Sequence, residues 1–162
     1  SVSFMRRKIA MKYVRKAVPS DVSRIAEILI FTKRTQYRPI FQNDQVSFGE
    51  MQVLPLAEEL LSAPDKLDGY WVYDDAFVKG ILCLSGKEVK ELYVEPFFQS
   101  QGVGGVLLEF AVSERGADTL WVLEKNDKAV RFYRSHGFEP TGKRCLEEGT
   151  TEYIMKMGRK RT

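Results

Sequence analysis

Apolar and polar residues follow two different spacings along this chain of 162 residues, and the changes between them divide it into segments. Apolar residues three and four positions apart predict helices that begin after the N-cap Ser20 and that cover 52–61, 103–115 and 127–136. Between the first two helices, 35–44 lacks a regular pattern and is expected to be irregular. Alternation predicts strands over 12–17, 69–74, 77–84, 88–94, 119–123 and 151–157, with one more strand before the turn at 147–149.

The predicted order of elements is β-α-α-β-β-β-α-β-α-β-β. This order indicates a mixed α/β (α+β) fold, in which a mostly antiparallel sheet of six to seven strands is flanked by about four helices. The length fits one domain over 1–162, with 1–11 and 158–162 expected to be flexible tails.

Composition narrows the class of protein further. Hydrophobic residues make up 44% and charged residues 29%, which is typical of a folded globular chain. No apolar run approaches the roughly 20 residues that span a bilayer, so no membrane partner is expected. Cys83 and Cys145 lie far apart and no secretory signal is evident, so we expect a cytoplasmic protein without a disulfide. The net charge of +3 comes with basic clusters near both ends, where solvated tails are commoner than nucleic-acid contacts, and no nucleic-acid partner is expected.

The stretch Gln99–Leu108 joins a predicted strand to a predicted helix and is rich in glycine. Gly102, Gly104 and Gly105 carry no side chain that would keep a ligand away from the backbone. The N–H groups at the start of a helix carry partial positive charge, which suits a phosphate or pyrophosphate. The loop therefore predicts an anion-binding site.

The spacing within the loop separates several classes of nucleotide site. A Walker A loop ends in Gly-Lys-Ser/Thr, whereas this loop ends Gly104-Gly105-Val106, which excludes a P-loop NTPase. A dinucleotide fingerprint needs a third glycine where Leu107 stands and a loop close to its strand, so that interpretation is weak.

Two motifs carry a resemblance to a known family. Val94–Pro96 followed by Gln99-x-x-Gly102-x-Gly104 resembles the acyl-CoA loop Q/R-x-x-G-x-G/A of the GNAT acetyltransferase superfamily. The block Asn126–Phe138 resembles the family segment N-x-x-A-x-x-F/Y-Y-x-x-x-G-F. The resemblance implies a GNAT-like fold and an acetyl-CoA-dependent N-acetyltransferase, in which an amine attacks the thioester directly in a ternary complex without a metal.

The resemblance also implies a donor site. Loop amides would hold the pyrophosphate, and a bulged strand that diverges from its neighbour would pair with the pantetheine arm. The implied donor-site residues are Leu92, Tyr93, Val94, Gln99, Ser100, Gln101, Gly102, Val103, Gly104, Gly105, Asn126, Ala129 and Tyr133. Asn126 is equally a favoured N-cap for the helix that follows it, and the two roles are compatible.

Candidate catalytic groups come from the same segments. Tyr133 is placed by the family motif as the acid that protonates the leaving thiolate, and core packing is the alternative. Glu88 and Glu91 are rival general bases, and for each a solvated charge at the strand edge is the alternative. Alternation puts them on opposite faces of the strand unless a bulge intervenes. The single histidine, His136, ends a predicted helix, where capping is favoured over catalysis.

The residues expected to bind the acetyl acceptor are compatible with more than one class of substrate. Tyr37, Arg38 and Phe41 are the candidate substrate-binding residues, but aromatic walls suit a cationic amine whereas an arginine suits a carboxylate. The expected partner is thus a small-molecule amine or a peptide amine, and a homodimer is left open. The alternative function is a non-catalytic acyl-CoA-binding or protein-interaction module on the same fold.

Overall fold

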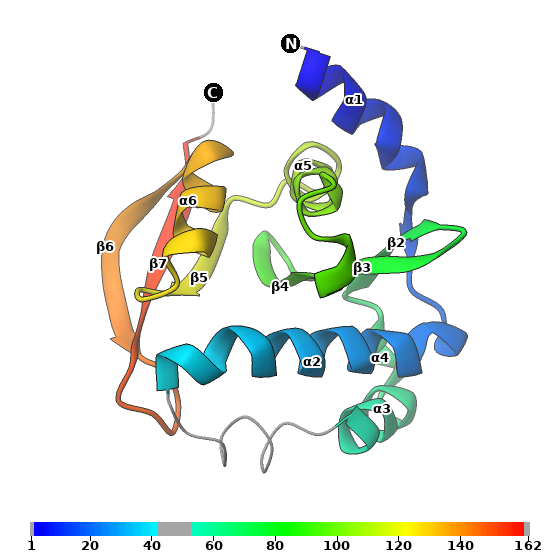
Figure 1. Ribbon diagram of the computed structural model, residues 1–162, viewed down its shortest axis with the longest axis horizontal. Coiled ribbons are helices and arrows are strands. Elements are labelled where there is room, and N and C mark those ends of the chain that lie inside the picture. The colour runs from blue at the N-terminus through cyan, green and yellow to red at the C-terminus, as the bar shows by residue number, and fades with distance from the viewer. Residues whose placement is uncertain (1, 42–52, 161–162) are drawn as a thin grey trace.

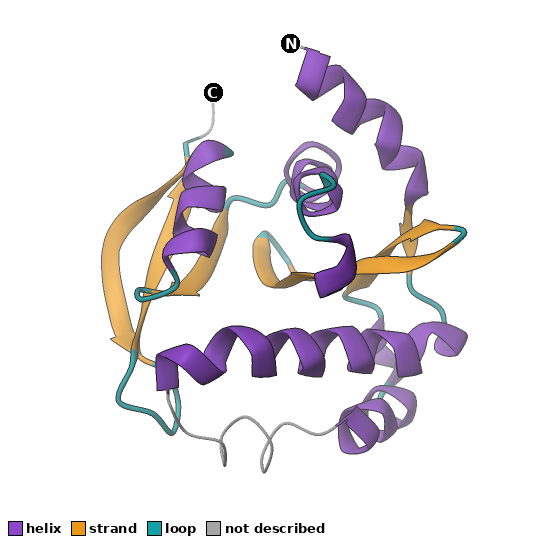
Figure 2. Ribbon diagram, in the orientation of Figure 1, coloured by secondary structure: helices purple, strands orange, loops and turns teal. Residues whose placement is uncertain are grey.

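The structure is a computed structural model that describes residues 2–41 and 53–160, with the side chains of 36–41 and 53–54 left outside the description. Seven strands form one sheet in the order β1-β2-β3-β4-β5-β7-β6. Helices cover both faces of this sheet (Figures 1 and 2). The strands are β1 (Val14–Lys16), β2 (Tyr70–Asp75), β3 (Phe77–Ser85), β4 (Glu88–Val94), β5 (Thr119–Leu123), β6 (Phe138–Leu146) and β7 (Tyr153–Arg159).

The helices divide between the two faces. One face carries α2 (Val22–Phe41) and α3 (Val53–Ser62), and the other carries α5 (Val103–Arg115), α6 (Asp127–Ser135) and the N-terminal α1 (Val2–Ala10) (Figure 1). The short α4 (Pro64–Leu67) leads into β2, and single 3₁₀ turns lie at Met11–Tyr13, Pro19–Asp21 and Pro96–Phe98. Among the described residues, no helix has both the length and the apolar character needed to cross a bilayer.

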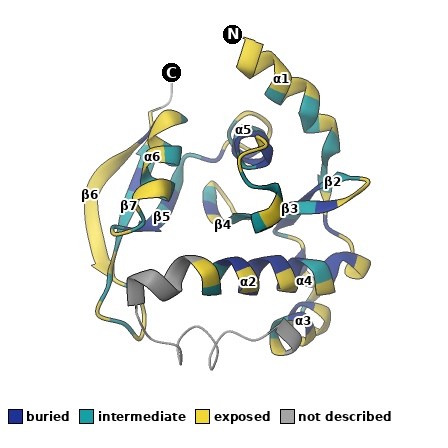
Figure 3. Ribbon diagram, in the orientation of Figure 1, coloured by how far each residue is buried: buried dark blue, intermediate teal, exposed yellow. Residues whose placement is uncertain are grey.

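The sheet matches the predicted fold class. All neighbouring strands pair antiparallel except β4 and β5, which run parallel. The predicted order of strands and long helices is confirmed, with α1 and α4 in addition. Buried residues lie on the sheet-facing sides of α2 and α5, whereas β6 is exposed along most of its length (Figure 3).

Gly80 of β3 determines how closely α5 approaches the sheet. A Cβ atom at this position would lie 2.9 Å from Val103 Cγ1 and 3.0 Å from Leu107 Cδ1. The absence of that atom lets the first two turns of α5 pack directly on β3. The start of α5, which carries the glycine loop, is thereby held against the middle of the sheet.

Several predicted boundaries differ from the structure. The first strand starts at Val14 because Met11–Tyr13 form a 3₁₀ turn. The segment predicted to be irregular from residue 35 is helical as far as Phe41. It continues α2 beyond the buried stripe of that helix, and Pro39 removes only one backbone N–H donor. Residues 42–44 lie outside the described residues.

The start of the first long helix also differs from the expected cap. Ser20 lies inside the 3₁₀ turn before α2, and the Asp21 carboxylate accepts the hydrogen bond from the Val18 N–H at 2.8 Å. Parts of the two segments expected to be tails have regular secondary structure. Val2–Ala10 form α1, which packs along α5, and β7 extends to Arg159.

Candidate active site

Strands β4 and β5 diverge after two paired positions. Glu88 pairs with Thr119 and Val89 with Leu120, and beyond them β5 pairs only with β7. On its other side β4 carries an extra residue, because Cys83 faces Glu91 whereas the next residue of β3 faces Val89. This shift is a bulge at Lys90, which bends the strand away from β5. The bulge and the divergence that the family resemblance implied are both present.

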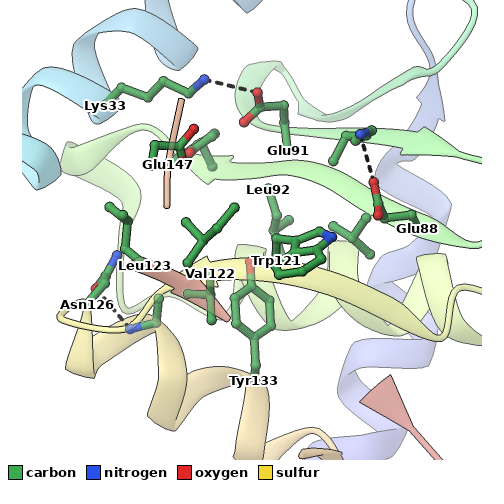
Figure 4. Close-up of a pocket in the computed structure, with 15 residues that line it drawn as sticks. Lys33, Glu88, Glu91, Leu92, Trp121, Val122, Leu123, Asn126, Tyr133 and Glu147 are labelled. Carbon is green, nitrogen blue, oxygen red and sulfur yellow. Dashed lines mark hydrogen bonds and ion pairs between the residues drawn. The ribbon is translucent and has the colours of Figure 1, made fainter. Parts of the chain in front are cut away.

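A cavity of about 390 Å³ lies where the two strands separate. Its walls come from α2, β4, β5, α6 and the turn between β6 and β7 (Figure 4). The polar and aromatic residues that line it are Lys33, Glu88, Lys90, Glu91, Tyr93, Trp121, Asn126, Tyr133 and Glu147.

A second cavity of about 640 Å³ adjoins the first and extends to the glycine loop. The two cavities share Leu92, Tyr93 and Ala129, so the edge of β4 runs from one to the other. All the predicted donor-site residues except Val103 line one cavity or both, because the Val103 side chain is buried in the core against β3.

The loop reaches α5 through two residues with positive φ. Ser100 has φ 67°, which is uncommon for a residue with a side chain, and Gly102 has φ 86° at the N-cap of α5. The Gly102 carbonyl accepts the first α-helical hydrogen bond from the Val106 N–H at 3.1 Å. The N–H groups of the first turn therefore have no acceptor within their own helix and point toward the loop.

Gln99 links the loop to its neighbours. Its Nε2 donates to the Val94 carbonyl at 3.1 Å, and its Oε1 accepts from Lys128 Nζ at 3.4 Å. The side chain thus fixes the loop between the end of β4 and the first turn of α6. This geometry gives Gln99 a role in holding the loop in shape.

Asn126 and Tyr133 both combine a structural contact with a place at the first cavity. Asn126 Oδ1 accepts the Ala129 N–H at 3.2 Å, which is the N-cap geometry. The Tyr133 ring packs against Phe132 and Phe138 with centroid separations of 5.3 and 6.2 Å. Its hydroxyl end points into the cavity, toward Val122 and Leu92 (Figure 4).

The two candidate carboxylates both reach this cavity, because the bulge interrupts the alternation along β4. Glu91 Oε1 lies 3.0 Å from Lys33 Nζ, and both side chains are about one-fifth exposed. Glu88 Oε2 lies 2.8 Å from Lys90 Nζ, which is 56% exposed. The hydrogen bond from Lys90 to Glu88 raises the pKa of that lysine. Of the two carboxylates, Glu91 has the more enclosed partner.

Nucleophilic catalysis by cysteine has no support near the cavity. Burial raises the pKa of the Cys83 thiol to about 11, so the group stays protonated at neutral pH. Cys145 is exposed on β6. Glu124 accepts two hydrogen bonds from Arg144, at 2.7 and 2.9 Å.

The candidate acceptor residues Tyr37, Arg38 and Phe41 fall at the end of α2, and their side chains lie outside the described residues. The sequence interpretation missed Lys33 and Trp121. A signal for Lys33 was present, because it lies four residues after Leu29 and so continues the buried stripe of its helix.

Comparisons with known proteins agree with this geometry. Residues 66–140 match the family model of the acetyltransferase (GNAT) domain. That segment holds β4, the glycine loop, α5, β5 and α6. The match confirms the predicted resemblance of this part of the chain to the GNAT superfamily.

Individual relatives extend the comparison. The chain is 41% identical over 69 residues to peptidyl-lysine N-acetyltransferase YjaB of Escherichia coli, covering 43% of this chain and 47% of that protein. It thus spans about half the length of the curated relatives it matches. The fold is similar to an N-acetyltransferase from Staphylococcus aureus, with TM-score 0.72, 13% identity, and coverage of 89% and 98% of the two chains. It is also similar to the PaiA N-acetyltransferase of Thermoplasma acidophilum in complex with coenzyme A, with TM-score 0.65, 20% identity, and coverage of 88% and 96%.

Proposed function

We propose that this chain is an acetyl-CoA-dependent N-acetyltransferase that acts on a peptide amine. The observation that carries the proposal is the divergence of β4 from β5 beside the glycine loop, which opens two adjoining cavities along one strand edge. A long ligand with an anionic end and an extended arm matches that arrangement. The structural neighbour from Thermoplasma acidophilum, which was solved with coenzyme A, supports the same ligand class.

The residues present fit such a donor. The loop offers backbone N–H groups at the start of α5, where a pyrophosphate is stabilised by the helix dipole. Beyond Val89, no strand among the described residues lies beside β4 on the β5 side, so its edge can pair with an extended arm as an added strand would. The acetyl-CoA thioester supplies the activated acyl group.

The acceptor cavity favours a cationic substrate. Glu88, Glu91 and Glu147 all line it, and Lys33 and Lys90 are each paired to one of these carboxylates. A lysine side chain carries a positive charge that this wall would attract. The name of the Escherichia coli relative, a peptidyl-lysine N-acetyltransferase, supports a lysine within a peptide.

Proton movements are assigned to two side chains. An alkyl ammonium of pKa about 10 must lose a proton before it can attack a carbonyl carbon. We assign the acceptance of that proton to the Glu91 carboxylate, whose partner Lys33 is less exposed than Lys90, the partner of Glu88. We assign the donation of a proton to the departing thiolate to the Tyr133 hydroxyl, whose end points into the same cavity.

The test combines binding and transfer. Thermal stability of the full chain is measured with and without millimolar acetyl-CoA, and thiol release is then followed with a panel of lysine peptides, polyamines and amino acids. Stabilisation together with thiol release from a lysine peptide is the expected result. Stabilisation without transfer to any amine would favour the non-catalytic binding module, and no stabilisation would reject both.

A further inference from the structure

Two basic side chains meet at Gly105, in the first turn of α5. A Cβ atom on Gly105 would lie 3.3 Å from Arg7 Cδ and 3.4 Å from His136 Nε2. Arg7 comes from α1 and His136 from the end of α6, and both helices lie beside α5 (Figure 1). Glycine at this position is what allows the three segments to converge.

Each of these two side chains has a buried nitrogen atom that lacks a hydrogen-bond partner among the described residues. Arg7 Nε and His136 Nε2 are inaccessible to solvent and make no hydrogen bond with any residue that the structure describes. The other ring nitrogen, Nδ1, lies 3.1 Å from the Phe132 carbonyl, which can only accept. Nδ1 therefore carries the hydrogen in this contact. The unpaired N–H of Arg7 Nε is costly in such a place and indicates an absent acceptor.

The surrounding wall is positively charged. Arg6, Arg7 and Lys128 line the same cavity as His136, and the described lining contains no aspartate or glutamate. Among the described residues, no carboxylate pairs with either arginine. An anion is therefore the ligand class that this end of the cavity would bind most favourably.

The end of the cavity at Arg7 and His136 would bind an anion other than the pyrophosphate. The N–H groups at the start of α5 already provide for a pyrophosphate, and the Gly104 position faces Val94 and Phe132 near that loop. The Gly105 position faces Arg7 and His136 instead. Coenzyme A carries one further phosphate, a monoester on its ribose.

We propose that Arg7, with Arg6, Lys128 and His136 around it, binds the ribose 3′-phosphate of coenzyme A. The proposal rests on the proposed function, since it assumes that the donor is a coenzyme A thioester. It assigns to α1 a direct part in donor recognition and makes the site selective for coenzyme A over 3′-dephospho-coenzyme A. Arg7 Nε supplies a donor that no described protein group satisfies.

Calorimetric titration of the full chain with coenzyme A and with 3′-dephospho-coenzyme A tests this proposal without any catalytic readout. The unaltered chain is expected to bind coenzyme A about tenfold more tightly, the effect of one charge-assisted contact group. Arg7→Gln and Arg6→Gln are expected to reduce that preference while leaving the affinity for the dephospho form unchanged. Lys8→Gln is the matched control, because Lys8 is exposed on the same helix and does not line the cavity.

Three outcomes would contradict either the phosphate site or the proposed function. Equal affinity of the unaltered chain for the two ligands overturns the phosphate site and leaves the proposed function standing. Equal loss of affinity for both ligands in Arg7→Gln and Arg6→Gln overturns it too, since the arginines would then act on the shared part of the ligand or on the fold. Failure of the unaltered chain to bind either ligand contradicts the proposed function itself.

Discussion

Lys33 of α2 and Glu91 of β4 form an ion pair of 3.0 Å across the wall of the first cavity. The pair joins a helix on one face of the sheet to the bulged strand, just where β4 leaves β5. It holds the Glu91 carboxylate at the cavity, on the side opposite the Tyr133 hydroxyl (Figure 4). This placement makes Glu91 the carboxylate that we expect to accept the proton of the amine.

Glu91→Gln is expected to lower kcat about 100-fold, because the amide keeps the shape of the side chain but cannot accept the proton. Glu88→Gln is the matched control and should change kcat less than about threefold, within the effect of a partly exposed charge. Initial rates of thiol release at saturating acetyl-CoA measure both. A larger loss in Glu88→Gln than in Glu91→Gln would reverse the assignment.

Tyr133→Phe separates the acid role from packing. Phenylalanine keeps the ring that contacts Phe132 and Phe138, so the packing of the ring is retained. The loss of the hydroxyl should lower kcat about 10- to 100-fold while the affinity for acetyl-CoA stays the same. Undiminished kcat in this variant would remove Tyr133 from the chemistry and leave it a packing residue.

Gly80→Ala tests the close approach of α5 to β3. The new methyl group would meet Val103 and Leu107 at 3.0 Å or less, so α5 must shift or the side chains must leave their rotamers. The free energy of unfolding should fall by about 1–3 kcal/mol, as for other overpacked cores. Urea denaturation measures it, and a variant as stable as the unaltered chain would contradict the packing described here.

The ion pair of Arg15 with Asp21 predicts a dependence of stability on pH. The Arg15 guanidinium donates to both carboxylate oxygens at 2.8 and 2.9 Å and holds the pKa of Asp21 below its ordinary range. A lowered pKa in the folded state stabilises the protein above about pH 4, and that contribution is lost as the pH falls through the folded-state pKa.

Asp21→Asn should therefore lower stability at neutral pH and flatten the loss of stability on acidification. Urea midpoints between about pH 7 and about pH 3 measure the effect. Asp65→Asn, at an exposed position of α4, serves as the control. A curve for Asp21→Asn parallel to that of the unaltered chain would show that the pair does not couple stability to pH in this range.

Local sequence patterns determine much of this fold. The segments with alternating apolar residues form β2 to β5 and β7. Gly102 and Gly116 lie at the two ends of α5, each with positive φ. Such features depend on neighbours within a few residues, so they can be read from the sequence. The glycine loop and the family motifs were predictable for the same reason, because a phosphate-binding helix start is a local structure.

The arrangement of the candidate site depends on contacts between residues that are far apart in the sequence. The bulge at Lys90 arises from the register between β3 and β4, and it alone brings Glu88 and Glu91 to one cavity. The contact between Lys33 and Glu91 joins residues 58 positions apart. Arg7 approaches Gly105 only because α1 packs on α5, whereas its sequence suggested a charged tail. Register and helix docking are set by tertiary packing, which single-sequence periodicity does not contain.

Acetyl transfer from acetyl-CoA to a peptide lysine at the cavity between β4 and β5 is tested most directly by incubating the full chain with acetyl-CoA and lysine peptides. The measurement follows both free thiol and the mass of the peptide. The predicted result is acetylated lysine matched by released coenzyme A, with both products strongly reduced in Glu91→Gln. Binding of acetyl-CoA without acetylation of any lysine peptide or other amine would contradict the claim.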